Sequence, residues 1–427
     1  MFRALLAFAL LVIVAGCDRS PSDSLDALAR DYVLTSLTIG EKEEGYIDAY
    51  YGPPELQAAA KADAAKLSLE ALSAKVAALR KRAAALATGN DLDTRRARFL
   101  EAQLTAAETR LRMMRGEKLS FVDEAEGLFG VRPEIRPLAS YDPIVAGIEE
   151  LVPGTGALPD RVENFSNRFV IPSDKLKTVF DAAIAECRRR TLRHIALPAH
   201  ERFDLAFVTG KSWGGYNYYQ GNAHSRIEIN TDLPSRIDRA LDLGCHEGYP
   251  GHHVLNALLE QKLTRGRNWI EFSMYPLYSP QSLLAEGSAN YGIELAFPGD
   301  EKLAFETRAL YPLAGIATAD AAAYAKLQNA LKALSGARFT IARDYLEGRI
   351  DDPTAVALLQ RYQLLSRERA EKSLSFIKQY RSYVINYGLG HDMVRASVER
   401  AGTAPAVRWA RMTQLLSEPT LPSDLTR

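Results

Sequence analysis

Hydrophobic residues recur at helical spacing along most of the chain. Apolar positions return every three or four residues over 69–86, and the same spacing resumes over 100–114 after the Gly89-Asn90 break. Two amphipathic segments joined by a short break predict an antiparallel helical pair. Similar texture predicts further helices over 173–194, 316–347, 353 onwards and 370–399. The pattern therefore predicts a mainly α protein.

Two stretches depart from this pattern. Three short β-like runs at 203–208, 216–219 and 226–230 are separated by glycine-rich breaks, which predicts a small antiparallel sheet. The segment 121–172 is rich in proline and glycine with weak periodicity, so we expect a long connection or a linker there.

The N-terminus resembles a bacterial export signal. The apolar run 4–15 is too short to span a bilayer, and it ends in Val-Ala-Gly directly before Cys17, which resembles a bacterial lipobox. We therefore expect a signal peptide over 1–16, lipid on Cys17 and a polar tether over 17–24. The expected location is the bacterial cell envelope, on a lipid anchor facing the periplasm, and Asp18 favours the inner membrane.

The composition is that of an ordinary globular domain, with 47% hydrophobic and 25% charged residues. We expect one helical domain over 25–427, with a helical N-terminal part at 25–120 and a catalytic part at 173–427. The 53 basic residues balance the 53 acidic ones, so nucleic acid is not an expected partner. Cys187 and Cys245 are too few for a disulfide framework, and we expect both to be small buried core residues.

The segment 244–254, GCHEGYPGHHV, holds three of the seven histidines. In a His-Glu-x-x-His zinc helix the second histidine stands four residues after the first, but here that position is Pro250, which cannot ligate and breaks the helix. We expect the helix to bulge at Pro250 so that a later histidine returns toward His246. A two-residue bulge favours His252 as the second ligand. His253 would then support the ligands from behind or contact the substrate. Spacing alone does not decide between the two histidines. Glu247 is the expected general base.

The third ligand is expected from the segment 282–291. Glu286 lies there among small and apolar residues, where an unpaired carboxylate would be costly and a metal ion would remove that cost. The alternative is an exposed glutamate on a helix face. Asp242 lies one turn before His246. It is a candidate to accept a hydrogen bond from the His246 ring nitrogen that does not bind the metal, and the alternative is a solvated surface residue.

These residues resemble a known family. The motif at 246–253, Glu-Gly-x-Ala-x-Tyr at 286–291, Tyr-Gly-Leu-Gly at 387–390 and Tyr-Ile-Asp-Ala-Tyr-Tyr-Gly-Pro at 46–53 are similar to the bacterial family called domain of unknown function 885. The resemblance implies a helical zincin-like metallopeptidase fold, similar in design to thimet-type oligopeptidases and Taq-type carboxypeptidases. In those proteins a Gly-His pair supplies the second zinc histidine, which favours His252. Many members have tryptophan where this chain has Ser288.

Other residues are candidates for substrate contacts. The run 226–230 resembles the edge strand with which zinc peptidases pair an extended peptide. Tyr387 is a candidate donor to the oxyanion of a tetrahedral intermediate, and a half-buried packing tyrosine is the alternative. Arg381 and His391 are candidates to bind a substrate carboxylate.

The expected function is hydrolysis of peptide bonds by an enzyme that carries one zinc ion. Its alternative is a non-catalytic lipoprotein that binds peptide or envelope components through a structural or lost metal site. An intact Glu247 beside His246 favours the enzyme, because a structural site needs no base there. End-trimming and internal cleavage remain open.

Overall fold

The computed structural model describes residues 24–89 and 91–426, so the expected signal peptide, the lipid on Cys17 and nearly all of the tether lie outside the described residues. The structure is mainly helical, as the pattern predicted. Its first helices are α1 (Leu25–Gly40), α2 (Pro54–Ala64), α3 (Leu69–Leu86), α4 (Leu92–Met114), α5 (Phe121–Phe129), α6 (Asp142–Leu151), α7 (Leu158–Ser166), α8 (Leu176–Thr191), α9 (Ile237–Leu243) and α10 (His252–Leu259). The helices that follow are α11 (Pro280–Ala296), α12 (Glu301–Phe305), α13 (Tyr311–Ala314), α14 (Ala321–Lys332), α15 (Ala337–Leu346), α16 (Asp352–Gln363), α17 (Arg367–Tyr380), α18 (Ile385–Ala401) and α19 (Pro405–Ser417).

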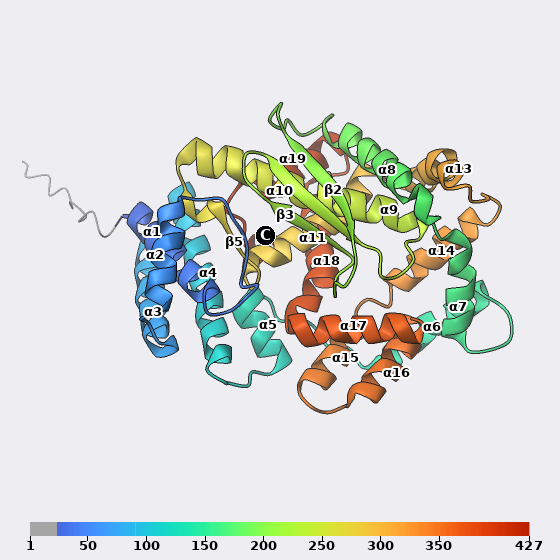
Figure 1. Cartoon of the computed structure of the whole chain (residues 1–427), viewed down its shortest axis with the longest axis horizontal. Coiled ribbons are helices and arrows are strands. Elements are labelled where there is room, and N and C mark those ends of the chain that lie inside the picture. The colour runs from blue at the N-terminus through green and yellow to red at the C-terminus, as the bar shows by residue number, and fades with distance from the viewer. Residues whose placement is uncertain (1–23, 90, 427) are drawn as a thin grey trace, which may run out of the picture.

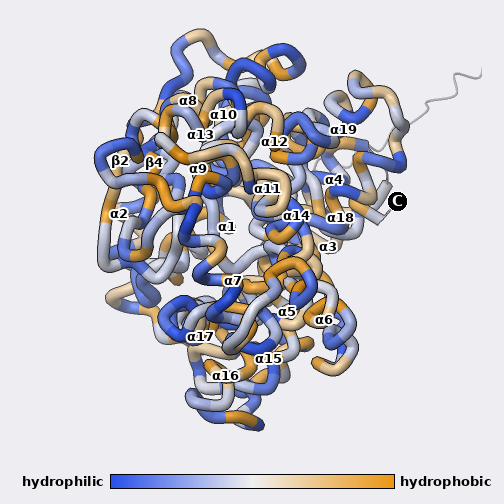
Figure 2. The backbone as a smooth tube through the Cα atoms, turned by 90° about the vertical axis from the view of Figure 1, so that its right-hand side faces the viewer, coloured by the Kyte–Doolittle hydropathy of each residue, from blue (hydrophilic) through white to orange (hydrophobic). Residues whose placement is uncertain are grey.

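The predicted helical pair is α3 and α4, which pack against each other at one end of the molecule together with α1 (Figure 1). Ser68 begins α3 by accepting a hydrogen bond from Ala71 N, and Asp91 begins α4 by accepting one from Thr94 N. Their apolar stripes are buried, whereas their other faces are polar. Figure 2 shows the same alternation of hydrophobic and hydrophilic positions along many of the helices. The amphipathic pattern thus reflects a real core.

The segment 121–172 is not a linker, which corrects the expectation. It forms α5, α6 and α7, which are only nine, ten and nine residues long. Helices this short give little periodicity, and the prolines and glycines between them mask what remains. In α5, Ser120 caps the N-terminus and Phe121 and Phe129 are fully buried.

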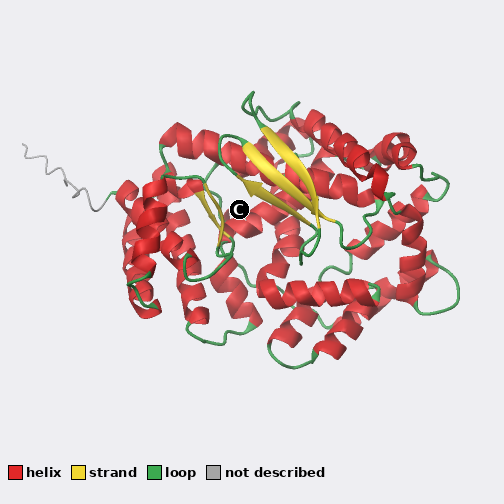
Figure 3. Cartoon of the chain, in the orientation of Figure 1, coloured by secondary structure: helices red, strands yellow, loops and turns green. Residues whose placement is uncertain are grey.

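A three-stranded sheet covers the centre of the molecule (Figure 3). It consists of β2 (Arg202–Val208), β4 (His224–Asn230) and β3 (Gly215–Tyr219), in that spatial order. β3 runs antiparallel to β4, as expected, but β2 runs parallel to β4, so the sheet is mixed. A separate antiparallel pair joins β1 (Ile47–Tyr50) to β5 (Met274–Pro276).

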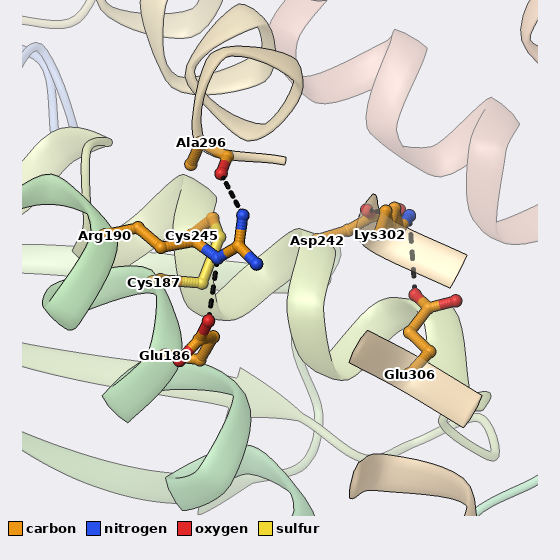
Figure 4. Close-up of a disulfide and its surroundings, with 8 residues drawn as sticks. All are labelled: Glu186, Cys187, Arg190, Asp242, Cys245, Ala296, Lys302 and Glu306. Carbon is orange, nitrogen blue, oxygen red and sulfur yellow. Dashed lines mark hydrogen bonds and ion pairs between the residues drawn. A yellow bond between two sulfur atoms is a disulfide. The ribbon is translucent and has the colours of Figure 1, made fainter. Parts of the chain in front are cut away.

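Cys187 and Cys245 form a disulfide, which corrects the expectation of two free core thiols. Both residues are fully buried, as expected of core residues. The bond joins α8 to a π-helical turn at Gly244–Gly248, and Figure 4 shows it beside Arg190, which bonds Glu186 and the carbonyl of Ala296. The sequence could not reveal the pair because 58 residues separate the two cysteines.

Among the described residues, none of the helices combines the length and the apolar character that crossing a bilayer requires.

Candidate metal centre

The histidine-rich segment is a helix broken at Pro250, as the sequence predicted. α9 leads into the π-helical turn Gly244–Gly248, the chain leaves helical geometry at Tyr249, and α10 begins at His252. The amide of Gly251 donates a hydrogen bond to the carbonyl of Cys245 at 3.1 Å. A Cβ on Gly251 would lie only 1.7 Å from the carbonyl oxygen of His246, so only glycine lets the chain fold back this tightly.

The fold-back brings three side chains together. His246, His252 and Glu286 each offer a ligand atom, and these atoms lie within 4.8 Å of one another. The two Nε2 atoms are 3.1 Å apart, and Glu286 oxygens lie 3.1 Å from His246 Nε2 and 3.7 Å from His252 Nε2. Nitrogen and oxygen ligands about 2.0–2.1 Å from a tetrahedral ion are about 3.3 Å apart. The three atoms therefore have the spacing of ligands that share one ion.

Small residues hold α11 in position to present Glu286. A Cβ on Gly287 would lie 2.3 Å from the carbonyl oxygen of Gly390 in α18, and one on Gly292 would lie 2.7 Å from Pro250. α11 thus touches both α18 and the break after His246, and its glycines permit this approach.

Two neighbouring side chains orient these groups. Asn290 Oδ1 lies 3.0 Å from His246 Nδ1, and the hydroxyl of Tyr383 donates to Glu286 Oε1 at 2.7 Å. The remaining oxygen of Glu286, Oε2, is buried and accepts no hydrogen bond, although it lies 3.1 Å from His246 Nε2. An orphaned buried carboxylate oxygen is costly unless a cation neutralises it, so this donor set fits a divalent metal.

The pKa values reflect the same crowding. Burial lowers the pKa of His252 to about 4, which keeps its imidazole neutral and able to ligate. For His246, burial lowers the pKa, but the carboxylates of Glu286 and Glu247 outweigh it and raise the value to about 9. Because these carboxylates draw a positive charge onto His246, a metal ion would compete with that proton.

Glu247 faces the same space without being one of the three grouped residues. Burial raises the pKa of its carboxyl to about 7. Gly215 of β3 makes room for this carboxylate, because a Cβ there would lie 2.8 Å from Glu247 Oε1. A carboxyl with a pKa near neutrality can both accept and return a proton.

These residues line a cavity of about 940 Å³. Tyr387 lines it too, with its ring stacked 6.3 Å from that of His246 between centroids, and His391 reaches it from the next turn of α18. The His391 ring pairs with Glu294 and Asp392. The volume is large enough for a short peptide.

Two expected site residues have other partners. Asp242 lines the cavity but pairs with Lys302 instead of His246, because Asn290 already occupies the outer nitrogen of that histidine. Arg381 bonds the buried Glu124 at 2.7 and 2.9 Å, so its guanidinium is committed within the fold.

His253 lies neither behind the ligands nor against the cavity. It is fully buried, with Nδ1 2.8 Å from Ser225 Oγ and Nε2 3.0 Å from Glu201 Oε2. Tyr249 and Arg188 bond the same glutamate. Hydrogen bonds from His253, Tyr249 and Arg188 outweigh burial and lower the pKa of Glu201 to about 2. His253 therefore belongs to a buried polar network under the metal-centre helix.

The strand at the cavity is β3, which corrects the expectation for 226–230. β4 is the central strand, because β2 pairs with its other side, and so β4 has no open edge. Gly215, Tyr216 and Asn217 of β3 line the cavity. The order of strands in the sheet is set by a crossover that the local pattern does not encode.

Sequence reasoning missed several residues of the site. Asn290 stands four positions after Glu286 on the same helix face, a spacing that could have marked it. Asp48 of β1 lines the cavity and accepts a hydrogen bond from the Tyr216 hydroxyl. Burial and the neighbouring carboxylates Glu286 and Glu247 raise the pKa of Asp48 to about 8. Tyr383 had no signal beyond its nearness to Tyr387 in the chain.

Comparisons with known proteins support the fold and do not identify an activity. No protein-family model and no curated protein matches the chain. Among solved structures, it is similar to a protein from Colwellia psychrerythraea described as a "putative lipoprotein", with 14% identity, a TM-score of 0.51, and coverage of 83% of this chain and 71% of the other. An M32 carboxypeptidase from Deinococcus radiodurans R1 aligns over 91% of this chain and 87% of its own at 15% identity, with a TM-score of 0.37. At these identities the first likeness shows the fold alone.

Proposed function

We propose that the chain is a zinc-dependent metallopeptidase that hydrolyses peptide bonds. The observation that carries the proposal is the convergence of His246, His252 and Glu286 within 4.8 Å, with Glu247 beside them in one cavity. Two histidines and a carboxylate with a separate glutamate base are the donor set of catalytic zinc sites, which keep one position open. The motif resemblance to the domain of unknown function 885 family supports the same proposal.

Each residue then has a role in the reaction. A zinc ion bound there would polarise the scissile carbonyl and acidify a water molecule. Glu247 accepts the proton of the attacking water and passes it to the leaving amine, for which a pKa of about 7 is well suited. The Tyr387 hydroxyl donates to the oxyanion. Asn290 and Tyr383 hold His246 and Glu286 in orientation.

The edge of β3 offers a binding surface for the substrate backbone. Its residues Gly215–Tyr219 pair with β4 on one side, and the other side lies along the cavity. An extended peptide can add to such an edge through main-chain hydrogen bonds. In this proposal β3, and not 226–230, is the strand that pairs with the peptide substrate.

The experiment that tests the function separates chemistry from metal binding. The zinc-loaded protein is incubated with a mixed peptide library, and products are read by mass spectrometry. Glu247→Gln should keep its zinc but lose about 10²–10⁴-fold in rate, because glutamine cannot accept the water's proton. Glu286→Gln, the matched control, should lose zinc affinity as well as rate. If Glu247→Gln turns over at the wild-type rate, or loses its zinc, the mechanism is wrong.

The competing function is non-catalytic binding of peptide or envelope components. It predicts zinc and peptide binding without turnover. A carboxyl that burial holds near neutral pKa beside the ligands favours catalysis, because a structural site would leave Glu247 without a task.

We also propose that the protein is lipid-anchored in the bacterial envelope and faces the periplasm. The lipobox-like residues before Cys17 support the anchor. The disulfide between Cys187 and Cys245 fits an oxidising compartment. Mass spectrometry of the mature N-terminus should find diacylated Cys17, and an unmodified Cys17 would rule the anchor out.

A further inference from the structure

Arg338 is a half-buried cation on the wall of the candidate site. It belongs to α15 and lines the cavity that holds Glu247. Its guanidinium lies over the ring of Phe376, with 5.0 Å from Cζ to the ring centroid, and its Nε is buried without a hydrogen-bond partner. Burial lowers the pKa of Arg338, and only the phenol of Tyr387 acts against this. Within the described part of the chain, no carboxylate pairs with Arg338.

Two other arginines nearby are paired, whereas Arg239, which also lines the cavity and has no ion pair among the described residues, is exposed to solvent. Arg343, on the same helix, lies 2.8 Å from Asp344, and Arg395, which also lines the cavity, lies 3.2 Å from Glu399. Even a partly buried charge is costly without a counter-charge, and proteins keep one where an outside group supplies the partner. Arg338 therefore has the surroundings of a residue that awaits an anion.

The position of Arg338 connects it to the reacting centre. Phe376 lies 6.0 Å from Tyr387, and Tyr387 lies 6.3 Å from His246, all between ring centroids. An arginine held over an aromatic ring keeps the N–H groups at its edge for bidentate bonds, and a carboxylate matches that fork. Arg338 and Tyr387 line the same cavity, so a carboxylate bound there is within the same space as the candidate reacting groups.

We infer that Arg338 binds a carboxylate of the substrate, so that the enzyme acts on peptides anchored by a free C-terminal carboxylate. This inference rests on the proposed function and deepens it, because it assigns a substrate class and a specificity residue. An aspartate or glutamate side chain of the peptide has the same chemistry, and the experiment distinguishes the two sources.

The experiment compares hexa-alanine with a free C-terminus, its C-terminal amide, and an amide carrying one internal glutamate. The zinc-loaded wild type should cleave the free acid with a kcat/KM at least tenfold above that of the plain amide. Arg338→Met, which keeps a long unbranched stem, should reduce this ratio at least tenfold, mainly through KM. Arg338→Lys keeps the charge and should retain part of the preference. Arg343→Met, on the same helix but paired elsewhere, is the matched control and should leave the ratio unchanged.

A second readout does not depend on turnover. In the Glu247→Gln background with zinc bound, calorimetry should show that Arg338→Met weakens binding of the free-acid peptide at least tenfold relative to the amide. Selective cleavage of the glutamate-containing amide would support carboxylate binding and move its source to a side chain. If wild type treats acid and plain amide alike, or if Arg338→Met lowers both equally, the inference is wrong although the peptidase stands. If no peptide is cleaved, the proposed function fails, and calorimetry alone decides the role of Arg338.

Discussion

At the scale of single residues, the neighbouring histidines His252 and His253 have different partners. His252 meets His246 across 3.1 Å, whereas His253 points into the network of Glu201 and Ser225. The two side chains differ by one position along α10, which turns them about 100° apart. The break at Pro250 decides which of them faces the candidate metal centre.

The pair gives a prediction in which each variant controls for the other. His252→Ala should lose zinc binding and leave the stability of the zinc-free protein almost unchanged, because its partners lie in the metal centre. His253→Ala should retain one zinc per chain and lose roughly 3 kcal/mol of unfolding free energy, because it leaves Glu201 with an unpaired lone pair in the core. Zinc stoichiometry and urea unfolding measure the two effects. If a folded His253→Ala protein loses its zinc, His253 and not His252 is the ligand, and the prediction is wrong.

Elements, rather than single residues, bring the ligands together. The break between α9 and α10 could be predicted because Pro250 forbids a regular helix. The position of α11 could not, since it depends on Gly287 meeting Gly390 more than a hundred residues away. The same limit explains the strand at the cavity, because residues 226–230 read as a strand but the pattern does not say which neighbours pair with it. Local periodicity identifies elements, and long-range packing positions them.

The disulfide is the second element-scale feature that the sequence did not reveal. It fixes the turn that carries His246 onto α8, because Cys245 directly precedes that histidine. A cross-link that closes a loop of 58 residues restricts the unfolded chain by about 4 kcal/mol in the chain-entropy model.

Replacing both cysteines by alanine should therefore destabilise the protein by about 2–5 kcal/mol and also weaken zinc binding, because the turn beneath His246 is released. Urea unfolding and a competitive zinc titration measure these effects. Alkylation of the denatured, unreduced wild type is the control, and it should label neither Cys187 nor Cys245. Labelling of either one would show that the bond is absent.

At the scale of the whole molecule, buried ionisable groups determine how the free energy of unfolding changes with pH. One continuous cluster of buried apolar residues runs from Leu28 to Leu425, and ionisable groups are caught within it. Glu306 is one of them. It is buried, its Oε1 accepts no hydrogen bond, and Lys302 approaches no closer than 3.8 Å because that lysine pairs with Asp242 (Figure 4). Burial raises the pKa of Glu306 to about 8, although Lys302 acts in the opposite direction.

The sign of the pH effect follows from that shift. Below the unfolded value of 4.5, Glu306 is protonated in both states and has no effect on the pH dependence. Between 4.5 and about 8 the unfolded chain releases this proton while the folded protein keeps it, so the free energy of unfolding falls as pH rises. Glu306→Gln cannot ionise, so its free energy of unfolding should not fall in this way.

The free energy of unfolding of Glu306→Gln, relative to that of wild type, should therefore rise by roughly 3 kcal/mol between pH 5 and pH 8 in urea titrations. Glu371→Gln, on the exposed face of α17, controls for simply removing a carboxylate, and its difference from wild type should stay flat over the same range. If the Glu306→Gln difference is equally flat, Glu306 is ionised in the folded protein and Lys302 neutralises it together with Asp242.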